Sequence, residues 1–152
     1  MSEVLKFALL GLGGGAVYGI LAQGVVLVYR GSGVVNFAEG ALGMFAAYLY
    51  YQLHLYHGWA SPPAFIASIG GVTLVGVCFS HFVMQPLQSK SQLARLVATL
   101  GLLALLTSLA IAIWGPNPII VASPLPSGVV TIGNGTIGVD RLWLFGVGVL
   151  IA

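Results

Sequence analysis

The polar residues that could do chemistry are concentrated in one short segment of the chain, GSGVVNFAEG (31–40). Asn36 and Glu39 have the spacing of a helix N-cap and the third helical residue, where each side chain can bond to the other's free backbone N–H. A carboxylate in the first turn of a helix is also stabilised by the helix dipole. The spacing therefore favours helix capping as the main role of Glu39.

Direct contact with a transported solute is the alternative for this carboxylate, and an ordinary interfacial position is the third interpretation. A carboxylate inside a membrane costs about 2.5–3.5 kcal/mol on insertion scales and by default marks a functional site. A helix broken at that depth is tolerated only where protein or a water-filled cavity covers the freed backbone. We therefore predict a discontinuous helix that lines a translocation pathway and restarts near Asn36. The candidate residues of this break are Gly33, Asn36, Phe37, Glu39 and Gly40.

The remaining reactive side chains form no recognisable catalytic or metal site. His54 and His57 are three residues apart and close to Trp59, which is typical of an aromatic belt at a membrane surface. His81 and the single cysteine, Cys78, stand apart from them in the sequence. No Ser/His/Asp or Cys/His grouping, phosphate loop or carboxylate pair stands out. The sequence therefore predicts no metal, no cofactor and no enzymatic activity.

The composition indicates the class of protein that must position these residues. Of the 152 residues 59% are hydrophobic, and only 5% are charged, whereas soluble domains carry roughly 25% charged residues. So few charges cannot cover a water-facing surface, and so apolar a chain does not stay disordered. The formal net charge of +2 is too small and too scattered for nucleic-acid binding. The chain is therefore expected to be an integral membrane protein in contact with a lipid bilayer.

Apolar runs predict an all-α polytopic membrane protein. At about 1.5 Å per residue, a run of about 20 residues crosses a hydrocarbon core of about 30 Å. Four runs reach this length, the second only if it includes the polar segment, and a fifth covers roughly half a membrane. We therefore interpret residues 1–152 as one transmembrane domain and the N-terminal fragment of a longer protein. The predicted spans are 7–29, a broken 34–53, 64–84, 96–114 and a truncated 142–152.

The positions of Lys and Arg predict the orientation of these spans. Arg30 lies between the first two spans, and Lys90 and Arg95 lie between the third and fourth. Cytoplasmic connections carry an excess of such residues. The connections 54–63 and 115–140 are therefore expected outside.

The long outer connection contains two β-prone runs around an Asn-Gly turn. Residues 129–132 and 136–139 flank Gly133-Asn134-Gly135, which predicts a short extracytoplasmic β-hairpin.

Three glycines recur every four residues in the first span. Gly11, Gly15 and Gly19 would form a stripe that lets a neighbouring helix approach closely. We therefore predict a helix-packing seam along this stripe.

Two stretches resemble the branched-chain amino acid ABC transporter permeases. GGGAVYGILAQGVVLVYRGSGVVNFAEGALGMFAAY (13–48) is similar to the N-terminal region of that family, and LARLVATLGLL (93–103) is similar to a second signature. The family most often has His, sometimes Gln, at the position of Glu39, which argues for capping over an obligatory charge. Family members are about twice as long, and their second half contains the cytoplasmic loop that binds the ATP-binding subunit.

The resemblance implies a permease subunit of a binding-protein-dependent importer in the bacterial inner membrane. Its expected partners are a second permease subunit, two ATP-binding subunits and an extracytoplasmic solute-binding protein. Branched-chain amino acids, or in relatives urea and short amides, would be the solutes, and ATP hydrolysis would reside in the separate subunits. A secondary transporter or channel subunit, or a truncated fragment without transport of its own, are the alternatives.

Overall fold

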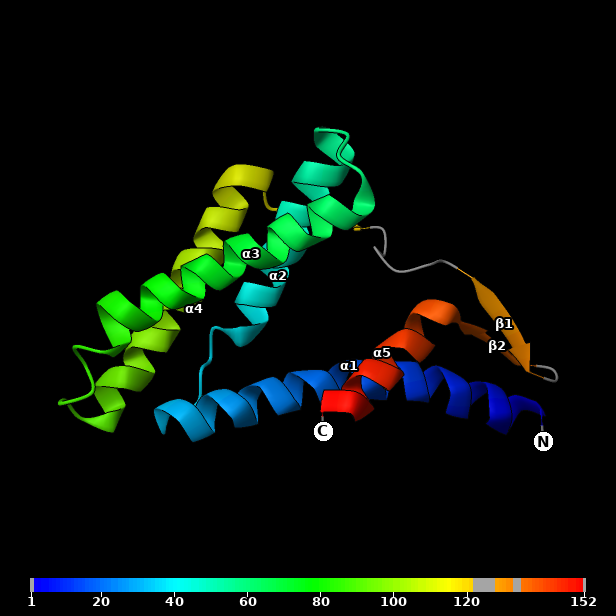
Figure 1. Ribbon diagram of the computed structural model, residues 1–152, viewed down its shortest axis with the longest axis horizontal. Coiled ribbons are helices and arrows are strands. Elements are labelled where there is room, and N and C mark those ends of the chain that lie inside the picture. The colour runs from blue at the N-terminus through cyan, green and yellow to red at the C-terminus, as the bar shows by residue number, and fades with distance from the viewer. Residues whose placement is uncertain (1, 122–127, 133–134, 152) are drawn as a thin grey trace. The chain divides into compact units, whose positions relative to one another are not determined.

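The computed structural model of the protein describes residues 2–121, 128–132 and 135–151, and these are mostly helical (Figure 1). The chain divides into two compact units, one formed by Met1–Leu27 with Ser123–Ala152 and the other by Val28–Ala122. The elements in chain order are α1 (Ser2–Ser32), α2 (Glu39–Tyr51), the π-helical turn η1 (Gln52–Tyr56), α3 (Ser61–Phe79), the π-helical turn η2 (Ser80–Met84), α4 (Gln92–Trp114), β1 (Val129–Ile132), β2 (Gly135–Gly138) and α5 (Val139–Ile151).

The predicted interruption of the second apolar run is confirmed, because α1 ends at Ser32 and α2 begins only at Glu39. Two helical segments of the described residues are long and apolar enough to cross a membrane. Ser61–Met84 has 24 residues with a mean hydropathy of 1.8, and Gln92–Trp114 has 23 residues with a mean hydropathy of 2.5. The first begins three residues before the predicted 64–84 because Pro62 and Pro63 occupy the first turn, where proline needs no N–H partner. The second begins four residues before the predicted 96–114, because Ser91 caps it by accepting the Ala94 N–H at 3.3 Å.

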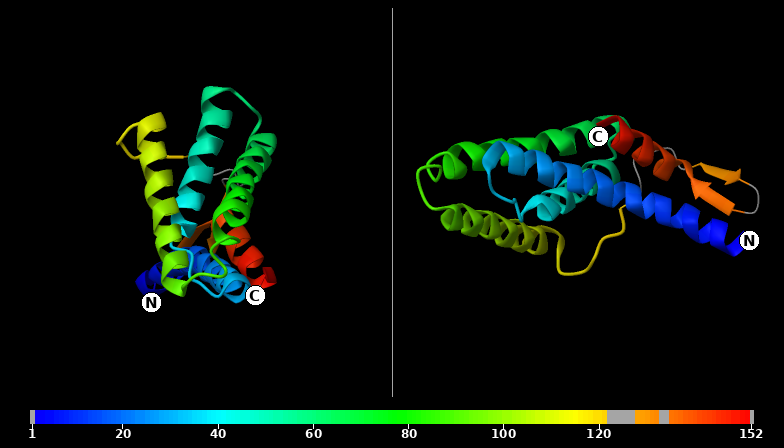
Figure 2. Two further views of the ribbon diagram at one scale, coloured as in Figure 1. Left: turned by 90° about the vertical axis from the view of Figure 1, so that its left-hand side faces the viewer. Right: turned by 90° about the horizontal axis from the view of Figure 1, so that it is seen from below.

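The unit 28–122 is built around α2, which contacts both α3 and α4 (Figure 2). Small residues on α2 and branched residues on α4 form its buried centre, where Leu106 is 2% exposed. Buried hydroxyls bond to their own helices: Ser68 Oγ donates to Phe65 O at 2.9 Å and Thr99 Oγ1 to Leu96 O at 2.8 Å. The core cluster consists of Ala38, Ala41, Leu102 and Leu106, with Leu42, Phe45, Val75, Phe79 and Leu103 packed against it.

One end of this unit is closed by aromatic rings and by η1. Trp114 Nε1 donates to Gln52 Oε1 at 3.0 Å, and the Trp114 ring lies 5.4 Å from Phe45 and 5.3 Å from Tyr48 between centroids. Two histidines bond to backbone carbonyls here: His54 Nδ1 to Trp59 O at 2.7 Å and His57 Nδ1 to Gln52 O at 2.9 Å. These histidines therefore hold the connection between α2 and α3.

In the other unit, β1 and β2 pair antiparallel, from Val129 opposite Gly138 to Ile132 opposite Gly135. The strands correspond to the two predicted β-prone runs, but α5 already begins at Val139, and residues 133–134 lie outside the described part. Gln23 Nε2 on α1 donates to Gly148 O on α5 at 3.0 Å. A Cβ at Gly148 would lie 3.3 Å from Ile20 Cγ1, so this glycine lets the two helices approach.

Candidate functional site

The helix break begins where Gly33 stops α1. Gly33 has a φ of 68°, a left-handed conformation that glycine adopts without steric cost, and its N–H donates to Tyr29 O at 2.8 Å. This is the αL termination of a helix. Ser32 Oγ reinforces the turn, because it lies 2.8 Å from Val28 O and accepts the Val34 N–H at 3.2 Å. Sequence-local contacts therefore suffice to end the helix here.

The way in which α2 starts corrects the predicted capping box. Asn36 Oδ1 accepts the N–H of Ala38, two residues on, at 3.0 Å, which is an Asx-turn. The N-cap is Ala38, without a side-chain cap bond, and Glu39 is the first residue of the helix instead of the third. The interpretation of Asn36 and Glu39 as reciprocal caps was wrong, because the Asx-turn uses the Asn36 oxygen and the N-cap lies two residues further along the chain, at Ala38.

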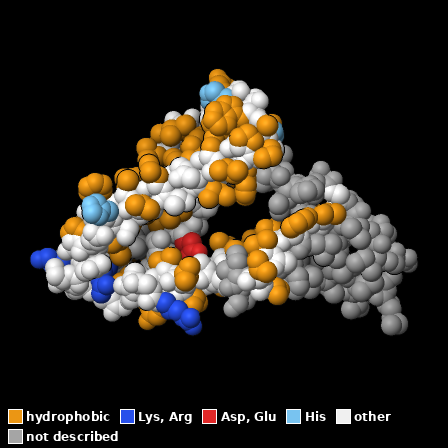
Figure 3. Space-filling view, viewed as in Figure 1, with side chains coloured by type: hydrophobic (Ala, Val, Ile, Leu, Met, Phe, Trp, Pro, Cys, Tyr) orange, Lys and Arg blue, Asp and Glu red, His pale blue; other side chains and the backbone are white. Residues whose placement is uncertain are grey.

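Glu39 is thereby left without the role that its spacing favoured. Its Oε2 atom is buried, yet no group of the described residues bonds to it. Figure 3 shows many hydrophobic side chains and few charged groups on the face in view. A buried polar atom without a partner costs about 1–3 kcal/mol, and more when it is charged. Such a cost at the start of a broken helix points to a functional reason for the carboxylate.

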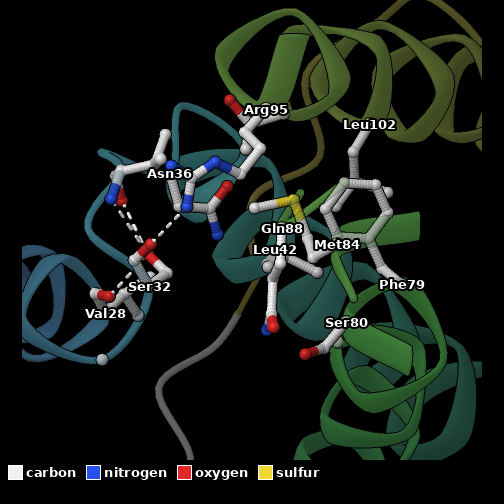
Figure 4. Close-up of a pocket in the computed structure, with 14 residues that line it drawn as sticks. Val28, Ser32, Asn36, Leu42, Phe79, Ser80, Met84, Gln88, Arg95 and Leu102 are labelled. Carbon is white, nitrogen blue, oxygen red and sulfur yellow. Dashed lines mark hydrogen bonds between the residues drawn. The ribbon is translucent and has the colours of Figure 1, made fainter. Parts of the chain in front are cut away.

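A cavity of about 740 Å³ lies beside the break, within the unit 28–122 (Figure 4). Its walls come from the end of α1, the segment before α2, the ends of α3 and η2, and the first turns of α4. In Figure 4, Ser32, Asn36 and Arg95 lie on one side, and Phe79, Met84 and Leu102 lie on the other. The cavity therefore has a polar side with one cation and a largely apolar side.

The beginning of α4 supplies bonds to the free backbone of the break. Arg95 Nη1 donates to Ser32 O at 3.0 Å, and Gln92 Nε2 donates to Gly33 O at 3.3 Å. The last carbonyls of a helix have no partner within it, and a cation near them is favourable. Sequence reasoning used Arg95 only for orientation and did not place it at the site. The available signal was the 93–103 stretch, which contains this arginine.

The five predicted break residues have different surroundings. Asn36 lines the cavity, whereas Phe37 is 50% exposed and Gly40 is exposed with open space around it. Gly33 shapes the turn and Glu39 holds the unpartnered oxygen. Of the five, the structure thus brings only Asn36 into the cavity wall, together with Ser32 and Arg95. The other four do not line the cavity: Gly33, Phe37, Glu39 and Gly40.

The stripe of Gly11, Gly15 and Gly19 has no neighbour in the described part of the chain. A Cβ built at each of them meets no heavy atom within 4 Å. The packing seam stays a prediction, and its partner helix would have to come from elsewhere.

Gly33→Val is expected to lower the free energy of unfolding by about 1–2 kcal/mol, because a side chain is strained in the left-handed region. Gly43→Ala is the matched control. Gly43 lies inside α2 with open space around it, so alanine is expected to stabilise by about 0.5–1 kcal/mol. Unfolding by SDS in mixed micelles, followed by tryptophan fluorescence, measures both. If Gly43→Ala and Gly33→Val lowered the free energy of unfolding equally, the result would contradict a special requirement for glycine in the left-handed turn at Gly33.

The site thus combines a helix break, an uncapped carboxylate, a cation and a cavity with one polar side. Sequence reasoning found the break and its carboxylate, and it missed the cavity and the role of Arg95. Among known proteins, no family model, no curated protein and no solved structure matches this chain.

Proposed function

We propose that the chain is part of a multi-pass permease and that the break at 33–38 lies on its solute pathway. The observation that carries the proposal is the cavity beside a broken apolar helix, with Asn36 and Arg95 in its wall. Interrupted helices next to polar cavities are the usual binding sites of membrane transporters, because freed backbone groups and side chains there replace solute hydration.

A membrane location is supported by the exposed surface of the unit 28–122. Large apolar side chains point outward along its helices, with Ile66 70%, Leu74 66% and Leu105 55% exposed. This pattern suits a helix surface in lipid and is costly in water. The finer proposal is four spans and a fifth begun by α5, in the bacterial inner membrane. The helix ends and connections at Arg30, Lys90 and Arg95 would then face the cytoplasm, and β1 with β2 would lie outside.

The resemblance of 13–48 and 93–103 to branched-chain amino acid permeases supports a more specific proposal. The chain would form one permease subunit of a binding-protein-dependent ABC importer. A second permease subunit, two ATP-binding subunits and a solute-binding protein would complete it. Both stretches that carry the resemblance contribute to the site, the first through the break and the second through Arg95.

Uptake by the complete transporter tests this function. The complex is reconstituted in vesicles with its solute-binding protein, and entry of radiolabelled leucine is measured with ATP and with a non-hydrolysable analogue. We expect uptake only with hydrolysable ATP. Vesicles that lack the permease chain are the control. Uptake driven by an ion gradient without ATP would contradict the importer and favour a secondary transporter.

A further inference from the structure

The cavity beside the helix break lies at the ends of two helical segments that are long enough to cross a membrane. The segment Ser61–Met84 ends with Met84 in the cavity wall, and the segment Gln92–Trp114 contributes Arg95 from its first turn. Spanning helices place their ends where the hydrocarbon core gives way to lipid headgroups. In the membrane location that we propose, the cavity would therefore lie at the depth of the lipid phosphates.

The wall of this cavity offers hydrogen-bond donors and a positive charge to an anion. Arg95 is the one charged group among the described residues that line it. A guanidinium has five N–H donors in a planar fork, and here Nη1 donates to Ser32 O at 3.0 Å, while Nε is buried and bonds to nothing in the described part of the chain. Because such a fork suits phosphate oxygens, the polar side of the cavity favours a phosphate group.

Two further cations lie close to the cavity without lining it. Arg30 precedes Gly31, and Lys90 follows Gln88 by two residues, and both Gly31 and Gln88 belong to the wall. In Figure 3 the Lys and Arg side chains in view lie toward one end of the unit 28–122. The single acidic residue in this part of the sequence, Glu39, does not line the cavity. Cations near a membrane surface attract acidic lipids, so a lipid with a net negative charge is favoured.

The remaining walls suit the apolar part of a lipid. Phe79, Met84 and Leu102 lie on the side opposite Arg95 (Figure 4). Leu102 is buried, whereas Gln88 in the same wall is exposed, so the cavity has a deep apolar side and an open side. The volume of about 740 Å³ leaves room beside a phosphate group for the beginning of an acyl chain, whose burial against these side chains is favourable.

We propose that this cavity binds the headgroup of an anionic phospholipid and that Arg95 bonds to the lipid phosphate. The proposal rests on the proposed function for the membrane location, and it adds a regulation of the same site. A lipid in the cavity must leave before a solute can pass, so acidic lipid would slow the proposed transport.

Native mass spectrometry of the full 152-residue chain in detergent tests the binding. The probes are phosphatidylglycerol and phosphatidylcholine with the same acyl chains. The choline ammonium cancels the phosphate charge of the second lipid. We expect a dissociation constant about tenfold or more lower for phosphatidylglycerol, because each Lys or Arg near the surface contributes about fivefold for an acidic lipid. Glycerol phosphate, added as a competitor at the lipid concentration, is expected to displace no lipid, because it lacks the acyl chains.

Two pairs of variants locate the lipid. Arg95→Gln is expected to weaken phosphatidylglycerol binding about tenfold or more, the effect of a lost charge-assisted hydrogen bond. Lys90→Gln, outside the cavity wall, is expected to weaken it about fivefold or less. Gly76 lines the cavity with open space around it, so Gly76→Leu is expected to weaken binding about tenfold or more by occupying the cavity. Gly70→Leu on the same helix, with equally open space outside the cavity wall, is its control.

Equal losses in Arg95→Gln and Lys90→Gln would indicate attraction by surface charge alone and overturn the proposal. Displacement of the lipid by glycerol phosphate would identify a free anion as the ligand and overturn it too. Wild-type binding by Gly76→Leu would place the lipid elsewhere. If Arg95→Gln disturbs the break, Gly76→Leu still decides the location, because it leaves the Arg95 bond to Ser32 in place.

Uptake measurements separate this site from the proposed importer. Leucine uptake is compared in vesicles of phosphatidylcholine with and without phosphatidylglycerol, and we expect slower uptake where the acidic lipid is present. Uptake that is equal in both would contradict the regulation. Lipid binding in the cavity without any ATP-dependent uptake would contradict the importer and leave the lipid site standing. ATP-dependent uptake by a chain that binds both lipids equally would do the reverse.

Discussion

Leu106→Ala is expected to lower the free energy of unfolding of the unit 28–122 by about 2–5 kcal/mol. Leu106 is 2% exposed and belongs to the core cluster with Ala38, Ala41 and Leu102. Two other members of this cluster, Ala38 before α2 and Ala41 in α2, are too small to fill the space that a removed isobutyl group leaves. The cavity term is therefore expected to add fully to the lost contacts.

Leu105→Ala is the control, since Leu105 is the adjacent residue of α4 and is 55% exposed. This change is expected to alter stability by less than about 0.5 kcal/mol. SDS-induced unfolding in mixed micelles, followed by tryptophan fluorescence, compares the two. Equal midpoints would mean that α4 does not present Leu106 to α2.

In the proposed importer, Glu39→Gln is expected to reduce leucine uptake about tenfold or more while assembly is maintained. The structure removes the capping role, in which an amide oxygen would serve as well as a carboxylate. Oε2 has no partner among the described residues, and we expect it to accept a hydrogen bond from the proposed solute or from a proposed partner subunit. Loss of a hydrogen bond to a charged group costs about 1.5–3 kcal/mol, which is tenfold or more in an equilibrium or rate constant.

Glu3→Gln is the control, because it removes another of the three acidic residues far from the break in sequence. Initial rates of ATP-dependent uptake and the yield of assembled complex are measured together. Wild-type uptake by Glu39→Gln would mean that the carboxylate does not contact the solute and acts only within α2. Loss of assembly as well as uptake would show that Glu39 bonds to a partner subunit.

The sequence was sufficient to predict the break but not the details of how the chain makes it. Polar residues inside an apolar run predicted the interruption, and Gly33 supplies the left-handed turn that ends α1. The start of α2 was misplaced, because an Asn can cap a helix or form an Asx-turn with the same oxygen. Asn36 forms the Asx-turn, and the local spacing of residues does not distinguish an Asx-turn from a helix cap.

The cavity could not be predicted in the same way, because it depends on contacts between distant parts of the chain. Arg95 meets Ser32 across 63 positions of the sequence, whereas helix periodicity describes neighbours three and four residues apart. The π-helical turns η1 and η2 were missed for another reason. η2 lies within the predicted span 64–84, whereas η1 begins in the predicted span 34–53 and ends in the predicted connection 54–63. Composition does not indicate the wider turn in either segment.

The bonds from Gln92 to Gly33 and from Arg95 to Ser32 also set an order of events during biosynthesis. They join residues 59 and 63 positions apart, so the carbonyls that end α1 acquire these partners only after α2 and α3 have left the ribosome. At about 5–20 residues per second, this interval lasts several seconds. During that time these carbonyls need hydrogen-bond donors from their surroundings, such as water. Once Gln92 and Arg95 have been synthesised, they can replace these donors by bonding to the carbonyls of Gly33 and Ser32. The contact between α4 and the break can form only from that step on.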